Sequence, residues 1–321
     1  MSLTQVVQRL LAQPTAPFHE EAVRAQVRRE LEGLPHVELV QDDFGNLIAH
    51  YKRGRLRARW AFAAHMDHPG YVNDPGGGER VFLGGVPESY RAAGPAVEEF
   101  GEFAMWALPA CELRDGRVYS RACDDLIGCA VIVGMMQELE RTGAQASVYG
   151  VFTRAEEVGF VGAIELARSG RIPKAVRFVS LETSSERGGA CTMGAGVIVR
   201  VGDRTSIFDS ESTAALVECA QREGITFQRA LMSGGTCEAS AYQLYGYTTA
   251  ALCVALGNYH NCGEADRIEP EYVAVSDVEA MWRLCCAAAV AGPSDPLGRL
   301  RERLEAGVEK HRRFTEPHRS A

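Results

Sequence analysis

Two adjacent glutamates, Glu156 and Glu157, end the apolar run in the segment VFTRAEEVGFVG, residues 151–162. The run is typical of a buried strand, and a glycine follows the glutamates. Because successive residues at a strand end face different ways, one carboxylate can hold a cation while its neighbour points at the group that the cation activates. This interpretation requires further metal ligands at comparable strand ends.

A histidine motif supplies the first of them. The buried run 58–64 is followed by His65 and Asp67 in AAHMDHPG. A histidine with a carboxylate two residues on is typical of a metal ligand with its orienting partner. Active sites of α/β sheets gather at this end of the strands. Taken alone, the motif is more typical of a polar loop after a strand.

Three more candidates follow along the chain. Asp124 begins a helical segment in CDDLIG, Glu182 follows the apolar run 175–181, and His260 follows the apolar run 248–256. A helix cap explains one aspartate of the DD pair but not both.

Together these residues predict a dinuclear centre. Two histidines and three carboxylates suit two divalent ions that share one bridging carboxylate. Two ions ~3.5–4 Å apart can share a water, lower its pKa toward ~7 and polarise a carbonyl. Glu156 would then be the general base, a role typically contributing ~10²- to 10⁴-fold.

The elements around these residues alternate between strands and helices, which predicts an α/β fold with a mixed, largely parallel sheet between helices. Two amphipathic helices and a β-hairpin around DDFGN open the chain. Residues 73–119 are rich in Gly, Pro and acidic residues broken by short apolar pieces, which indicates a small β-rich insertion serving as a lid or subunit contact. We expect residues 1–72 and 120–321 to form the catalytic domain.

Composition excludes several classes of protein. The 321-residue chain is 46% hydrophobic and 24% charged, with a formal net charge of -8, so we expect no nucleic-acid partner. We find no signal peptide and no run approaching the ~18 apolar residues of a membrane span. The ten cysteines show no CxxC spacing and are interpreted as reduced core residues. We therefore expect a cytoplasmic protein without membrane partners.

The motifs HMDHPG, DDLIG, EEVGFVGA, VSLE and GNYH, in this order, resemble those of the co-catalytic dinuclear zinc exopeptidases. The chain is most similar to the tetrahedral (TET) deblocking and glutamyl aminopeptidases. HEEAVRAQV, DDFGNLIA and SGGTCEASAYQLYGYTT extend the resemblance over nearly the whole catalytic domain.

The resemblance implies a role for each candidate. Asp124 would bridge two ions and join Asp125 through a cis peptide bond. His65 and Glu182 would complete one site, Glu157 and His260 the other, and Asp67 would orient His65. It further implies two divalent ions per subunit, zinc before cobalt or manganese, and a homo-oligomer.

The chain departs from the family pattern in three places. The insertion is shorter than is usual in the family, which argues against the large shell-like assembly. Glu182 stands where these proteins usually have aspartate. Cys237 and Glu238 follow GGT where the family tends to have aspartate and alanine.

The leading hypothesis is a metallo-aminopeptidase that hydrolyses N-terminal residues from short peptides through a metal-bridging hydroxide, with Glu156 as base. The alternative is a metal-dependent amidohydrolase or deacylase acting on N-acyl amino acids or small amides. A third hypothesis is a non-catalytic metal-binding protein that retains the fold.

Overall fold

The N-terminal segment forms two helices that pack against the body. The computed structural model describes residues 2–92 and 94–314. Helix α1 (Leu3–Leu11) begins at a capping box in which the Ser2 side chain accepts from the backbone of Gln5. Helix α2 (Glu21–Leu31) follows, and both helices contact α4 (Cys123–Thr142).

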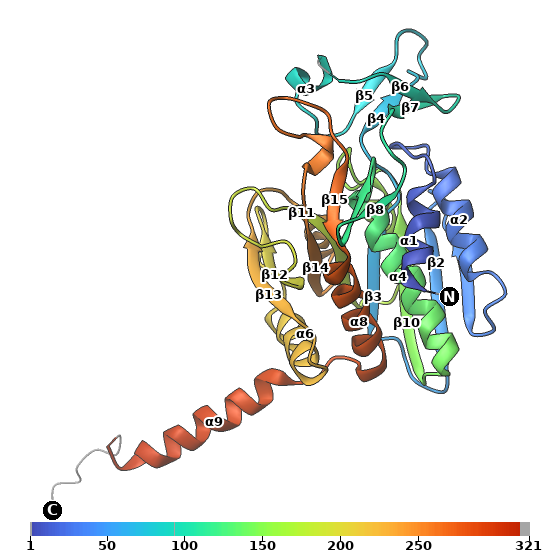
Figure 1. Ribbon diagram of the computed structural model, residues 1–321. Coiled ribbons are helices and arrows are strands. Elements are labelled where there is room, and N and C mark those ends of the chain that lie inside the picture. Colours follow the sequence, from blue (N-terminus) through green and yellow to red (C-terminus); the bar gives the residue numbers. More distant parts are fainter. Residues whose placement is uncertain (1, 93, 315–321) are drawn as a thin grey trace, which may run out of the picture.

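A mixed sheet forms the centre of the protein, and its middle strands are parallel (Figure 1). Antiparallel pairs join the first hairpin and β12 to this centre. This confirms the predicted mixed, largely parallel sheet. In spatial order its strands are β1 (Val37–Gln41), β2 (Leu47–Arg53), β10 (Ala146–Thr153), β3 (Trp60–His65), β11 (Arg177–Ser185), β14 (Thr249–Leu256), β12 (Val197–Asp203) and β13 (Phe227–Met232).

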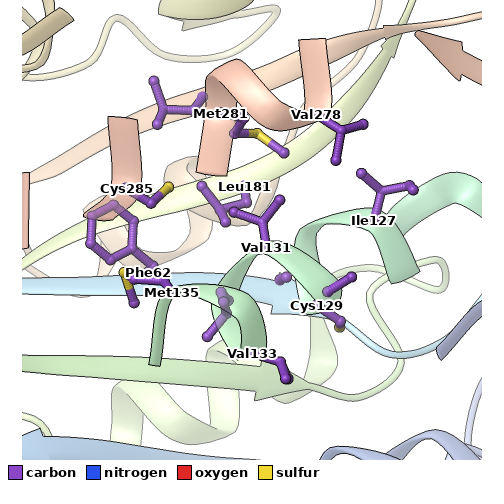
Figure 2. Packing of buried hydrophobic residues seen from close by; sticks show 14 of the residues in the cluster. Phe62, Ile127, Cys129, Val131, Val133, Met135, Leu181, Val278, Met281 and Cys285 are labelled. Atoms are coloured by element: carbon purple, nitrogen blue, oxygen red, sulfur yellow. The ribbon is translucent and has the colours of Figure 1, made fainter. Parts of the chain in front are cut away.

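Helices cover both faces of the sheet, as the alternation predicts. Helices α4, α8 (Val275–Ala291) and α6 (Ser210–Arg222) pack on one face. Helices α5 (Val161–Ser169) and α7 (Glu238–Leu244) belong to the other. Figure 2 shows side chains of α4 and α8 meeting those of the central strands, and this cluster is the larger core.

Strand β11 is longer than its apolar run suggests. The run ends at residue 181, but backbone pairing with β14 continues through Ser185 opposite Leu256. Glu182 therefore lies inside the strand, with its side chain buried, and not after its end. Polar residues extend the strand because the ladder, rather than side-chain hydrophobicity, holds them in place.

Two small sheets lie beyond the end of the main sheet that carries His65 (Figure 1). One has the order β5-β4-β7-β6 and the other β15-β9-β8. Most of these strands fall in the predicted insertion, 73–119, but β4 precedes it and β15 comes from the C-terminal part. Their bounds, with α3, are β4 (Gly70–Val72), β5 (Val81–Leu83), α3 (Glu88–Ala92), β6 (Val97–Glu99), β7 (Phe103–Trp106), β8 (Glu112–Arg114), β9 (Arg117–Ser120) and β15 (Glu271–Ala274).

The predicted domain boundaries stay a prediction. Residue 93 of the predicted insertion and residues 1 and 315–321 of the predicted catalytic domain lie outside the described residues.

The remaining elements are the short helices η1 (Tyr259–Asn261) and η2 (Arg312–Phe314), and α9 (Pro296–His311). Within residues 2–92 and 94–314, no helix is long and apolar enough to cross a bilayer. All ten cysteines are free thiols.

Replacing Leu181 with alanine should destabilise the protein because this side chain is fully buried between the sheet and α4 (Figure 2). Leu181→Ala should lower the free energy of unfolding by about 2–5 kcal/mol, measured by denaturant titration. Leu244 is the matched control, since 84% of it is exposed. Leu244→Ala should change stability by less than about 0.5 kcal/mol, and equal losses for the two variants would contradict the described core.

Candidate metal centre

The sequence-predicted site residues converge at one end of the central sheet. His65 ends β3, Glu156 and Glu157 follow β10, and Glu182 lies in β11. Asp124 begins α4, and His260 lies in η1 after β14. Parallel strands bring their carboxyl ends to the same edge, which is why segments far apart in sequence meet here.

Asp124 lies between the two histidines. Its Oδ1 is 3.4 Å from His65 Nε2, and its Oδ2 is 3.6 Å from His260 Nε2. Its peptide bond to Asp125 is cis. One carboxylate oxygen toward each histidine is the arrangement that two adjacent cation positions sharing a ligand require.

Both histidines are oriented through their other ring nitrogen. His65 Nδ1 lies 3.1 Å from the backbone carbonyl of Asp67, and His260 Nδ1 lies 3.2 Å from that of Gly85. A carbonyl can only accept, so Nδ1 carries the hydrogen in both rings. The Nε2 lone pairs therefore face the carboxylates, as in metal-ligating histidines.

Two sets of ligand atoms lie within 4.8 Å of one another: His65 with Asp124 and Glu157, and His65 with Asp125 and Glu182. Asp125 was not predicted as a ligand. Its Oδ1 accepts from the backbone N–H of Gly128 at 3.1 Å, and its Oδ2 has no hydrogen-bond partner among the described residues.

Unpaired carboxylate oxygens show that these residues fit divalent cations. Within the described chain, Asp124 Oδ1, Asp125 Oδ2 and Glu157 Oε1 are buried without a hydrogen bond. Glu157 Oε1 lies 3.1 Å from His260 Nε2 but lacks hydrogen-bond geometry. A buried carboxylate oxygen without a donor is costly, and a shared cation would compensate this charge.

Burial and the crowded charges shift the pKa of several members of the site. Burial, together with the charges of Glu182 and Glu157, raises the pKa of Glu156 well above its ordinary value. Burial raises the pKa of Glu182 to about 7. Burial alone would lower the pKa of His65, but the negative charge of Glu156 and the contact with Asp124 outweigh it and raise that pKa. The pocket thus favours bound positive charge.

Asp67 holds the glutamate pair more directly than it holds His65. Its Oδ1 accepts from Glu156 N at 2.9 Å and its Oδ2 from Glu157 N at 3.1 Å. The carboxylate is 3.7 Å from His65 Nδ1, which is too long for a hydrogen bond. The predicted orientation of His65 therefore comes from the Asp67 backbone, while the side chain fixes the glutamate backbone.

Several buried residues around the site were missed by sequence reasoning. Glu271 accepts from the backbone of Asp124 at 3.0 Å and of His260 at 2.8 Å. His68 hydrogen-bonds through Nδ1 to the carbonyl of Asp124 at 2.7 Å. Glu20 ion-pairs with Arg154 at 2.6 Å. The sequence signal for Glu271 was its place at the start of an otherwise apolar strand.

A cavity of about 380 Å³ opens on this cluster, which is a volume typical of small-ligand sites. His65, Asp124, Glu156 and Glu182 line one side of it. Arg200 of β12 also lines it.

A family model described as M42 glutamyl aminopeptidase matches residues 95–284, which is more than half of the chain. The chain belongs to this family. It is therefore a metal-dependent aminopeptidase of the M42 family, as the motifs predict, and the amidohydrolase alternative is not favoured. A candidate aminopeptidase of Acetivibrio thermocellus is 27% identical over 293 residues, covering 76% of this chain and 87% of the relative.

Solved structures share the fold of this M42 peptidase. The aminopeptidase APDkam598 of Desulfurococcus kamchatkensis superposes with a TM-score of 0.75 at 20% identity, covering 91% of this chain and 95% of that one. The TET1 peptidase of Pyrococcus horikoshii gives a TM-score of 0.73 at 21% identity, covering 90% and 99%. This confirms the predicted zinc-exopeptidase-like fold class.

Replacing Asp67 with asparagine should reduce turnover, because an amide nitrogen would then face a backbone N–H donor of the glutamate pair. We expect kcat to fall about 10- to 100-fold while the protein still folds, measured by steady-state kinetics and circular dichroism. Asp43, whose side chain is 99% exposed, is the matched control. Asp43→Asn should leave kcat unchanged, and an unchanged kcat in Asp67→Asn would contradict the assigned contact.

Proposed function

We propose that this M42 peptidase uses a dinuclear metal centre to remove residues from the N-terminus of short peptides. The observation that carries the proposal is Asp124, with one carboxylate oxygen toward each histidine. His65 and Glu182 would hold one ion, with Asp125 within reach of it, and Glu157 and His260 would hold the other. Zinc suits two histidines with carboxylates, and cobalt or manganese are alternatives.

Glu156 is the proposed general base. When bound, two divalent ions polarise the scissile carbonyl and lower the pKa of the attacking water. Glu156 lines the cavity, so its carboxylate can take a proton from that water and return it to the leaving amine. The Asp67 carboxylate holds the backbone of Glu156 in place.

The excess of negative charge supports a free N-terminus as the substrate group. A protonated α-amine is attracted by the buried carboxylates, whereas an N-acyl group carries no charge and gains nothing from them. The same argument weakens the deacylase alternative.

Arg200 supports a preference for an acidic first residue. It is 4% exposed and lines the same cavity. Its Nε is buried without a hydrogen bond, and no ion pair of Arg200 occurs within the described residues. The charges of Glu182 and Asp203 act on Arg200, but its Nε is left without an acceptor, and the carboxylate of an N-terminal Glu or Asp would supply one. We infer that such peptides are the preferred substrates.

Self-association is also part of the proposal. Related structures include a PhTET1 dodecamer and a TET1 peptidase that assembles into a tetrahedron or a large octahedral shell. We propose that this chain is a homo-oligomer with the insertion 73–119 at a subunit contact. Val81 and Leu113 in that segment are about 40% exposed apolar side chains.

Exchanging each glutamate of the pair for glutamine should separate the two roles. Glu156→Gln should keep the bound metal but lower kcat by about 10²- to 10⁴-fold, because the base is lost. Glu157→Gln, the matched neighbour, should lower metal content. Both are measured by elemental analysis and peptide hydrolysis. Substantial turnover by Glu156→Gln would remove it as the base.

Specificity for the first residue of the peptide should depend on Arg200. Arg200→Met keeps the volume of the buried side chain and removes its charge. The ratio of kcat/KM for a Glu-first peptide to that for a Leu-first peptide should fall about 10- to 100-fold, since a charged hydrogen bond contributes about 1.5–3 kcal/mol. Hydrolysis of both peptides is followed by mass spectrometry.

The same panel contains N-acetylated copies of each peptide and the exposed control variant Arg229→Met. The control should keep the wild-type ratio. If only the acetylated peptides were cleaved, the proposed aminopeptidase activity would be replaced by a deacylase activity. An unchanged Glu-first to Leu-first kcat/KM ratio in Arg200→Met would overturn only the preference for an acidic first residue.

A further inference from the structure

Helix α9 projects from the body of the molecule (Figure 1). None of its residues is buried. Its base is fixed to α6, because Glu218 ion-pairs with Arg299 and accepts from the Ser294 hydroxyl at 2.6 Å. Asp295 caps its first turn by accepting from Gly298 N. These contacts direct the helix away from its own α8.

One face of α9 is apolar. Leu297, Leu300, Leu304 and Val308 follow a 3-4-4 spacing, which places them in a single stripe. Leu304 is 60% exposed and Val308 is 64% exposed. A helix of this length is marginal in water without tertiary packing. The stripe therefore calls for a partner surface.

Basic side chains border this stripe. Arg301 and Glu305 lie along one edge, whereas Arg303 and Lys310 lie farther round on the other side. In the part of the chain that the structure describes, neither Arg301 nor Arg303 forms an ion pair. The partner surface should thus be an apolar groove with an acidic border.

The body carries such a groove along α8, and we name it the α8 groove. It consists of two adjoining cavities of about 560 and 550 Å³, which share Glu138 and Trp282. On α8 itself, the lining residues Glu279, Trp282, Cys286 and Val290 repeat at helical spacing. Val290 is 50% exposed.

Acidic groups dominate one half of the α8 groove. Glu30, Glu138, Glu140 and Glu279 line it. The first three already contact Arg9, Arg141 and His36, respectively, whereas Glu279 forms no ion pair among the described residues. The groove also contains Trp282 Nε1, a buried donor with no hydrogen-bond partner among the described residues. Of the acids in this half, Glu279 suits an arginine beside the α9 stripe.

The groove and the stripe also match in length. Each spans 12 residues of helix, from Glu279 to Val290 and from Leu297 to Val308, or about 16 Å. Because its anchored base points α9 away from its own groove, the occupant must come from another molecule. We propose that α9 of a second copy of this chain docks in the α8 groove, and that two copies exchange these helices reciprocally around a twofold axis.

A cysteine already in the groove allows a direct test. Cys286 lies at mid-groove, and Leu304 lies at mid-stripe. In the full-length Leu304→Cys variant, mild oxidation should give a disulfide-linked dimer on a non-reducing gel, with the bond mapped to residues 286 and 304. Adding Cys286→Ser should abolish it. A disulfide within one chain, or none between these two positions, overturns the proposal.

Solution mass gives an independent readout. Leu300→Asp with Leu304→Asp should lower the mass measured by light scattering at least twofold, at a concentration where the wild-type chain is associated. Ala306→Asp, on the opposite face of α9, is the matched control and should leave the mass unchanged. Peptide hydrolysis verifies that each variant is folded. A wild-type chain that is monomeric at tens of micromolar, or a mass that the double variant does not lower, overturns the exchange.

Discussion

Buried negative charge at one end of the sheet is the constraint on which the site depends. Five carboxylates gather around His65 and His260, and their side chains have little exposed surface. Like charges at such range repel strongly in a low dielectric, so the arrangement persists only with donors and cations in place. Backbone amides supply part of that compensation, and divalent ions would supply the rest. The carboxylates are Asp124, Asp125, Glu156, Glu157 and Glu182.

Asp67 and Glu271, which lie outside the candidate ligand set, accept hydrogen bonds from backbone amides of the site. Asp67 accepts from the amides of the glutamate pair, and Glu271 accepts from those of Asp124 and His260. Asp67 thus ties the segment after β3 to the segment after β10. Glu271 ties β15 to the start of α4 and to η1. The positions of Asp124, Glu157 and His260 depend on these ties, because these ligands lie in loops and at helix starts where no ladder holds them. His65 and Glu182 lie in β3 and β11, where backbone pairing holds them.

Much of this could be predicted from sequence because it depends on local pattern. Apolar runs located β3, β10 and β14, the segment CDDLIG located the start of α4, and the polar residue after each run was a site candidate. The end of β11 was missed because polar residues there are held by backbone pairing with β14. Asp125, Glu271 and Arg200 were missed because their significance lies in tertiary neighbours that no spacing encodes.

The contact between His260 and the carbonyl of Gly85 crosses from the C-terminal part of the chain to the segment that carries the small sheet. A chimera in which this segment is replaced by that of a relative would therefore also replace the backbone carbonyl that orients His260, a candidate ligand. Chimeras designed to alter assembly alone would have to retain the backbone around Gly85. Otherwise they would disturb catalysis without altering a single catalytic side chain.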